Sequence, residues 1–327
     1  MKKELGIFVL LAVLCAAVAI INPQFVSAAN LQNNARLIGM YGIFSIGMGI
    51  VIITAGIDLS VGSVFALQGV LLVMMLREWH WPWPAAVLAI IVGTMGLGCL
   101  HGLLITRVRL QPFIVTLCGL LFYRGAARFI ADDEAKGFGT EGYGMLRELA
   151  TGSVFALPMP FVLLLVIAVV MWVVLHRSVY GRYLFAVGRN EDAARYSGIN
   201  SRWIIASAYV VSAALAGIAG ILIAFYTNSI SPSGHGNFYE LYGIAAAVLG
   251  GCSLRGGEGS VIGIVIGTAL LQVLQNLVNL LGIPSSLNFA VMGAVILIGV
   301  LVDQVLAQRR QSRLARAGLR LSAEGRP

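Results

Sequence analysis

The residues of this chain that could do chemistry are charged side chains placed inside apolar sequence. The clearest is Asp58, in the segment 54–63, because long apolar runs lie on both sides of it. A carboxylate near membrane depth costs about 2.5–3.5 kcal/mol on insertion scales, so its presence calls for a specific role. Two interpretations stay open: Asp58 caps the helix that follows, helped by Ser60 and Ser63, or it lines a translocation route or gate.

A second such charge is Arg124, which stands about eleven residues, or some 16 Å, along the apolar run 113–130. An arginine at that depth must pair or face water. Asp58 and Glu240, which opens another apolar run, are the candidate partners. An ion pair that only holds helices together and a role in the translocation route both fit this pattern. The candidate pathway or gate residues are therefore Asp58, Ser60, Arg124 and Glu240.

A third constellation lies in the longest hydrophilic loop. Asn190 is a good N-cap, and Gly198 can take the left-handed position after the last turn of a helix. Glu191 and Asp192 would then stand in the first turn, where the helix dipole favours anions. The pattern predicts a two-turn helix over 190–198.

A helix this short is marginal on its own, so we expect it to rest on a partner or on another part of the same chain. Ala193 and Ala194 have small side chains that would allow a close approach. The alternative interpretation is a solvated loop helix without a partner.

Motifs of the common nucleotide and metal enzymes are missing from the sequence. None of the three lysines is followed by Ser or Thr, so there is no phosphate-cradling loop, and no His precedes Glu as in the zinc proteases. The four cysteines lie in or beside apolar runs without a CxxC pair, which is typical of small core residues. We expect no catalytic site, no metal and no cofactor in this chain.

The amino-acid composition indicates which kind of secondary structure positions these charged residues. Of 327 residues, 59% are apolar and only 11% are charged, and the mean hydropathy is +0.90. Soluble domains carry roughly 25% charged residues, so a soluble enzyme, a disordered chain and a fibrous protein are excluded. The sequence predicts an all-α polytopic membrane protein with about ten transmembrane helices.

Ten apolar runs are the candidate spans. They are 5–22, 37–55, 63–77, 85–105, 113–130, 157–175, 203–226, 240–251, 261–281 and 287–303. The eighth is too short to cross alone, and we expect it to be tilted, broken or re-entrant. The first resembles a signal peptide cleaved near 26–28, but its length favours an uncleaved span. We expect one transmembrane domain over 1–303 and a basic cytoplasmic tail over 304–327.

The distribution of basic residues predicts the orientation. With the N-terminus inside, sixteen Lys and Arg residues fall on the inner side and four on the outer side. Basic residues collect in cytoplasmic loops of membrane proteins. Both termini are therefore expected to be cytoplasmic.

Several motifs then carry a family resemblance. Segment 181–199 (GRYLFAVGRNEDAARYSGI) resembles the signature loop of the ribose-type permeases of bacterial ABC importers. Segment 53–63 (ITAGIDLSVGS) is similar to a second signature of that family, and segment 240–251 (ELYGIAAAVLGG) to a third. The likeness covers nearly the whole chain. The form of segment 53–63 is closer to the sugar branch than to the branched-chain amino-acid permeases, which are distant relatives.

The resemblance implies a permease subunit that moves a monosaccharide across the bacterial inner membrane. It implies two ATP-binding subunits, which would bind ATP and Mg²⁺, and a second permease copy or a sister permease. A periplasmic or lipid-anchored binding protein would deliver the sugar. The chain itself would not be an enzyme, and nucleic acid is not expected as a partner.

The same resemblance makes the loop around 188–198 a coupling helix that enters a groove on the ATP-binding subunit. The acid-capped helix predicted above agrees with that role. The residues assigned to coupling are Gly188, Asn190, Glu191, Asp192, Ala193, Ala194 and Gly198.

The alternative function is a secondary transporter that moves a small polar solute with an ion gradient. Such a carrier needs an intramembrane carboxylate, and Asp58 could serve. It does not require a structured, acid-capped helix in the cytoplasm. The predicted helix over 190–198 therefore favours the importer.

Overall fold

The computed structural model describes residues 2–139 and 142–284, together with the single positions 287, 290, 291, 293, 294 and 297. This part of the chain is almost entirely helical, which confirms the predicted all-α polytopic fold. The helices are α1 (Lys2–Ile21), α2 (Ala28–Ile53), α3 (Val61–Val73), α4 (Trp83–Thr106), α5 (Pro112–Ile130), α6 (Gly144–Thr151), α7 (Met159–Arg177), α8 (Val179–Arg189), α9 (Glu191–Tyr196), α10 (Ser201–Thr227), α11 (Tyr239–Leu249) and α12 (Val261–Leu280). A 3₁₀ turn at Pro23–Val26 precedes α2, and a π-helical turn at Met74–Glu78 extends α3.

Local sequence signals set where the long helices begin. Polar side chains accept hydrogen bonds from the first turns of α2, α10 and α12, and these N-caps are Ser27, Asn200 and Ser260. Prolines occupy the first turns of α4, α5 and α7, where a missing N–H removes no helical hydrogen bond. They are Pro84, Pro112 and Pro160.

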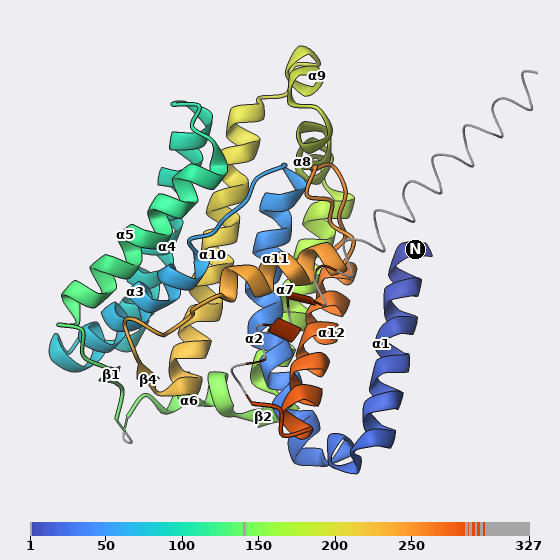
Figure 1. Cartoon of the computed structure of the whole chain (residues 1–327). Helices are drawn as coiled ribbons and strands as arrows, with labels where there is room; N and C mark the ends of the chain where they lie inside the picture. Colours follow the sequence, from blue (N-terminus) through green and yellow to red (C-terminus); the bar gives the residue numbers. More distant parts are fainter. Residues whose placement is uncertain are drawn as a thin grey trace, which may run out of the picture.

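Eight helices of the described part are long and apolar enough to cross a membrane. They and α11 coincide with the first nine predicted runs. Helix α11 has only eleven residues and crosses the bundle instead of running along it (Figure 1), as its short run predicts. Apart from a few single positions, the tenth run, 287–303, lies outside the described residues, as does the tail 304–327.

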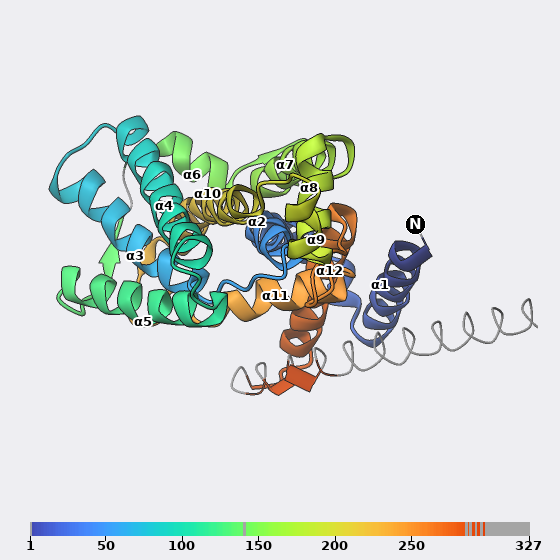
Figure 2. The same cartoon turned by 90° about the horizontal axis from the view of Figure 1, so that it is seen from above.

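Helices α2 and α10 form the centre of the bundle (Figure 2). In the most apolar stretches of these two helices, 78% and 72% of the residues are buried. Helix α10 packs against α4, α2 and α3, whereas α2 also contacts α7, α11 and α12. Helix α1 stands at the rim against α12 (Figures 1 and 2), with only 6% of its apolar stretch buried. Helix α2 is thus the most buried span of the described part.

The two ends of the bundle differ. One end carries α8 and α9 (Figure 1); the charge pattern predicts it to be cytoplasmic, and we call it the inner end. The opposite end carries α6 and two short antiparallel pairs. The pairs are β1 (Lys136–Gly137) with β4 (Ser229–Ile230), and β2 (Ser153–Val154) with β3 (Leu157–Pro158).

Candidate functional site

The hydrophilic loop between α7 and α10 contains two helices where the sequence predicted one. Helix α8 starts after Ser178, whose Oγ accepts a hydrogen bond from the Gly181 N–H (3.1 Å). Its side chains Leu184 and Val187 are buried, and the helix packs against α7, α10 and α2. The prediction missed α8, although a serine N-cap followed by apolar residues three apart was present as a signal.

The predicted cytoplasmic helix is observed as α9, which starts directly after Asn190. The Asn190 Oδ1 accepts a hydrogen bond from the Ala193 N–H (2.9 Å), so this N-cap is confirmed. Gly198 has a φ of +85°, the left-handed conformation expected after the last turn. Asp192 and Arg195 form an exposed ion pair at 2.7 Å.

The two alanines of α9 lie in different surroundings. Ala194 is buried in this chain, whereas Ala193 is exposed. At the start of the helix, Glu191 Oε1 accepts a hydrogen bond from Ser201 Oγ (2.9 Å), which ties α9 to α10. Helix α9 therefore rests on its own chain through Ala194 and Glu191 and leaves Ala193 available for an outside contact.

Three backbone segments touch at the base of α9, at what we call the glycine junction. It consists of Gly188 in α8, Ile53 at the end of α2, and Gly256 and Gly257 in the loop before α12. The Gly257 N–H donates to the Ile53 carbonyl (2.8 Å). A side chain on Gly188 would overlap that same carbonyl, and a Cβ on Gly256 would lie 2.5 Å from the Gly188 carbonyl oxygen. Only glycine at these positions allows the three segments to touch.

The second set of predicted site residues begins with Asp58, which is 4% exposed. Its Oδ1 accepts hydrogen bonds from the Ser60 N–H (2.9 Å) and the Ser60 Oγ (2.6 Å). The capping role expected of the two serines is wrong: Ser60 donates to Asp58, and Ser63 donates to the Ser60 carbonyl (2.7 Å). The aspartate itself shapes the turn before α3, because its carboxylate accepts the backbone N–H two residues ahead.

Hydrogen bonds from two other helices hold the segment around Asp58. The Ile57 carbonyl accepts from the Tyr209 hydroxyl of α10 (3.1 Å) and from the Thr116 hydroxyl of α5 (3.4 Å). Both donors are buried. The segment between α2 and α3 is therefore a fixed part of the bundle.

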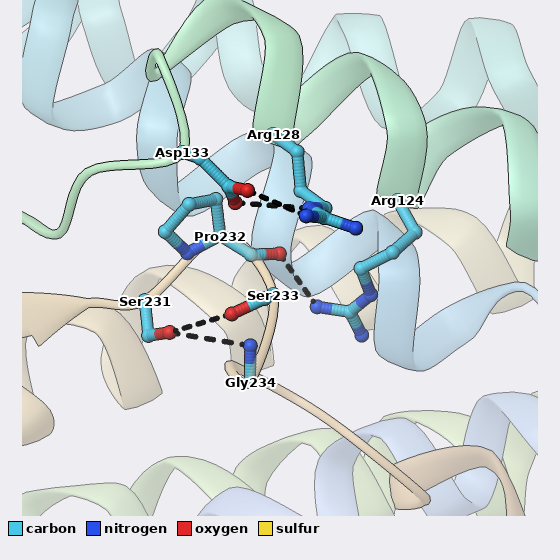
Figure 3. Close-up of polar contacts among 7 residues, drawn as sticks. All are labelled: Arg124, Arg128, Asp133, Ser231, Pro232, Ser233 and Gly234. Carbon is cyan, nitrogen blue, oxygen red and sulfur yellow. Dashed lines mark hydrogen bonds and ion pairs between the residues drawn. The ribbon is translucent and has the colours of Figure 1, made fainter.

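The ion-pair prediction for Arg124 is wrong. In the described part of the chain, Arg124 forms no ion pair with Asp58 or Glu240. Its Nη1 donates to the carbonyls of Pro232 (3.0 Å) and His235 (2.7 Å), and its Nη2 donates to the Gly62 carbonyl (3.2 Å); the contact with Pro232 is drawn in Figure 3. Pro232 and His235 lie in the non-helical segment before α11, so their carbonyls have no helical partner, and a guanidinium has five donors that can satisfy several acceptors at once.

Two further charged or polar side chains surround this contact. The Glu240 carboxylate lies against Gly62, at the place that a side chain on Gly62 would occupy. Gly62 and Gly236, which has a φ of +72°, touch backbone to backbone. His235, whose carbonyl accepts from Arg124, is only 8% exposed. We call Gly62, Arg124, His235, Gly236 and Glu240 the Arg124 node.

A surface pair beside the node offers a contrast within the same helix. Arg128 Nε donates to Asp133 Oδ1 (2.9 Å), and both side chains are about half exposed (52% and 50%) (Figure 3). This hydrogen bond lowers the pKa of the Asp133 carboxyl. Two arginines one helical turn apart thus have different roles, one bridging backbone segments and one pairing at the surface.

Sequence reasoning also missed a buried pair between α4 and α5. The His101 Nε2 and the Tyr123 hydroxyl are 2.8 Å apart, and both residues are less than 5% exposed. Among the described residues no group of three or more His, Cys, Asp or Glu could hold a metal ion. The two rings are also stacked, with centroids 5.7 Å apart, so the pair joins α4 to α5.

The predicted residues thus separate into two places. Arg124, Glu240 and the turn formed by Asp58 and Ser60 meet around the start of α3. The α9 residues lie at the inner end (Figure 1). Both places join backbone segments that are far apart in the sequence.

Comparison with known proteins agrees with this arrangement. A family model described as the permease component of branched-chain amino acid transport systems matches residues 30–300. The chain belongs to this family. As a member, it is a multi-pass integral protein of the bacterial inner membrane and the permease component of an ABC transport system.

Individual relatives are similar over almost their whole length. The ribose import permease of Bacillus subtilis is 38% identical over 92% of this chain and 93% of its own. The ribose import permease of Haemophilus influenzae is 35% identical over 93% of this chain and 94% of its own length. The D-allose transport system permease of Escherichia coli is 30% identical over 93% of this chain and 92% of its own length. No solved structure matches the chain.

Proposed function

We propose that this chain is the permease subunit of an ABC importer that carries a monosaccharide across the bacterial inner membrane. Relatives named as ribose and allose import permeases support a sugar as substrate, since the similarity extends over nearly the full length of both chains. The structural observation that carries the proposal is α9, which is capped, exposed at Ala193 and joined to the bundle at the glycine junction. An ion-gradient carrier has no need for such a helix.

Two ATP-binding subunits are the partners that α9 would contact. ATP and Mg²⁺ would bind to those subunits, because this sequence has no phosphate-cradling loop. A second copy of this chain or a sister permease would complete the pathway. A periplasmic or lipid-anchored binding protein would deliver the sugar at the end of the bundle that carries α6.

Energy from ATP would enter the membrane as a displacement of α9. At the glycine junction, Gly188 lies directly against the Ile53 backbone, and Ile53 is hydrogen-bonded to Gly257. A displacement of α8 and α9 therefore acts at once on the end of α2 and on the segment before α12. Because α2 is the central span, this contact is suited to open and close the inner end of the pathway.

The Arg124 node would hold the broken segments together while the longer helices move. Arg124 connects α5 to the start of α3 and to the segment before α11. Asp58 and Ser60 shape the turn that enters α3, and Glu240 lies at the start of α11 against Gly62. We assign these residues to the frame of the gate, where each positions the backbone.

Transport measurements separate this proposal from a secondary carrier. The complex of the chain with its ATP-binding subunits is reconstituted in liposomes with the binding protein and radiolabelled D-ribose. At clamped ATP, ionophores that collapse proton and sodium gradients should leave uptake unchanged, and the isolated chain should hydrolyse no more ATP than empty liposomes. Loss of uptake when the ionophores are added would identify an ion-driven carrier instead.

A further inference from the structure

A small cavity lies inside the bundle where α2, α11 and α12 meet. Its lining includes Tyr41 and Ser45 from α2, Tyr242 from α11, and Thr268 and Gln272 from α12. These positions lie well inside α2 and α12, so the cavity is in the middle part of both spans. Its free space is about 10 Å³, enough for about one water molecule.

Three of the polar groups that line the cavity have free hydrogen-bond acceptor capacity. The Gln272 side chain is 5% exposed, and its Oε1 accepts no hydrogen bond from the described residues. The hydroxyl protons of Ser45 and Thr268 are already donated to the carbonyls of Tyr41 (2.7 Å) and Ile264 (2.9 Å). Three oxygens therefore face the cavity with free acceptor capacity, and a buried acceptor without a donor is unfavourable.

Aromatic rings form the other part of the lining. The rings of Tyr41 and Tyr242 stack with centroids 6.0 Å apart and an interplanar angle of 18°. Tyr239 packs edge-on against both rings, and its hydroxyl lies 3.3 Å from the Tyr41 hydroxyl. The Gln275 amide donates to the Tyr242 hydroxyl. An apolar aromatic wall with a few fixed polar groups is the usual composition of a small-molecule site.

We propose that this cavity is the closed form of a subsite through which the transported solute passes, and that its ligand is a polyhydroxylated molecule of the monosaccharide class. Such a molecule supplies the hydroxyl donors that Gln272, Ser45 and Thr268 lack, and its C–H faces pack on Tyr41 and Tyr242. The inference rests on the proposed function. It adds the residues that contact the solute, none of which belongs to the Arg124 node or to α9.

The space for one water molecule is far too small for a sugar, so α11 must move relative to α2 and α12 for the subsite to open. The contact between α11 and α12 includes close backbone approaches at small residues. Gly267 lies against the backbone of Ala246, and Gly263 lies against Gly250. At these positions the backbones approach without interlocking side chains, whereas the hydrogen bond between Tyr242 and Gln275 must break when the helices separate.

The test compares two buried glutamines. Gln272→Leu removes the amide that faces the cavity, whereas Gln68→Leu removes one on α3 that also has an unpartnered Oε1 and donates only to the Ala216 carbonyl. In liposomes with the complete complex, we expect Gln272→Leu to lower D-ribose uptake about fivefold, with unchanged ATPase activity of the complex. Gln68→Leu should transport like the parent.

A specificity measurement separates solute contact from a purely structural effect. The parent should transport ribose faster than at least one monodeoxyribose, the analogue that lacks the hydroxyl meeting Gln272, and Gln272→Leu should lose that preference. Ser45→Ala, which removes another acceptor from the cavity, is the second variant if Gln272→Leu does not reach the membrane. It should lower ribose uptake by about threefold.

The outcomes distinguish the two levels of the proposal. If the parent imports ribose with ATP but Gln272→Leu and Ser45→Ala match Gln68→Leu in rate and preference, the subsite is overturned while the importer stands. If the parent imports no ribose, allose or fructose, the monosaccharide assignment and the subsite that rests on it are both overturned.

Discussion

The glycine junction and the Arg124 node both join segments that are far apart in the sequence, but they do so by different means. At the junction, Gly188 and Gly257 bring backbone against backbone with no side chain between the segments. At the node, the guanidinium of Arg124 bridges three carbonyls with hydrogen bonds of 2.7–3.2 Å. A direct backbone contact can only transmit a displacement, whereas a long polar side chain can follow its acceptors over a short distance. The junction is therefore suited to coupling and the node to holding the gate together.

The largest expected effect is at the junction. Gly188→Ala places a methyl group on the Ile53 carbonyl, and overpacking of this kind costs about 1–3 kcal/mol. We expect uptake to be abolished and the melting temperature of the purified complex to fall. Gly125→Ala is the matched control, since it is also helical and has open space around it. Normal uptake by Gly188→Ala would contradict transmission through the junction.

The next largest effect is expected on α9, which we propose contacts the ATP-binding subunit. Ala193→Arg leaves helix propensity nearly unchanged but adds a long side chain on the exposed side of α9. The variant should reach the membrane in normal amounts and fail to co-purify with the ATP-binding subunit, with uptake near background. Tyr183→Arg, exposed on α8, should retain assembly. If Ala193→Arg and the parent co-purify equal amounts of the ATP-binding subunit, α9 is a solvated helix that does not contact this subunit.

A smaller effect is expected at the Arg124 node. Arg124→Lys keeps the charge but replaces a planar fork with a point charge that cannot reach three carbonyls together. Loss of one or two buried hydrogen bonds to a charged group corresponds to about 1.5–3 kcal/mol each. We expect about tenfold slower uptake with a normal amount of protein in the membrane. Arg128→Lys, at the exposed pair with Asp133, should change uptake by less than about twofold. Equal losses of uptake in Arg124→Lys and Arg128→Lys would show that the two arginines do not have different roles.

The smallest effect is expected at Asp58. Asp58→Asn keeps an oxygen that can accept from the Ser60 N–H, and no ion pair is lost with Arg124 in the described part of the chain. Uptake should therefore stay within about twofold of the parent. Asp58→Ala removes the acceptor and should lower stability by about 1 kcal/mol, which thermal unfolding of the purified complex measures. A severe transport defect in Asp58→Asn would show that the negative charge itself is needed.

Local signals predicted much of the fold. Apolar runs located nine helices because membrane insertion depends on the summed hydropathy of about 20 neighbouring residues. Asn190 and Gly198 predicted the ends of α9 because caps act on backbone groups a few residues away. The short run over 240–251 predicted an incomplete span, and α11 is one.

Other features followed only from tertiary structure. A carboxylate was the candidate partner of Arg124, yet the side chain binds carbonyls of Gly62, Pro232 and His235, which come close to it only when the segment before α11 folds against α3 and α5. The acceptor-lined cavity has residues from three helices that are distant in the sequence. Nothing near Gly188 in the chain indicates that the Ile53 carbonyl will lie against it. By itself the sequence determined nine of the apolar helices, the caps of α9 and the family, because these depend on neighbouring residues. Only the tertiary structure decided which backbones touch, because such contacts depend on how the whole bundle packs.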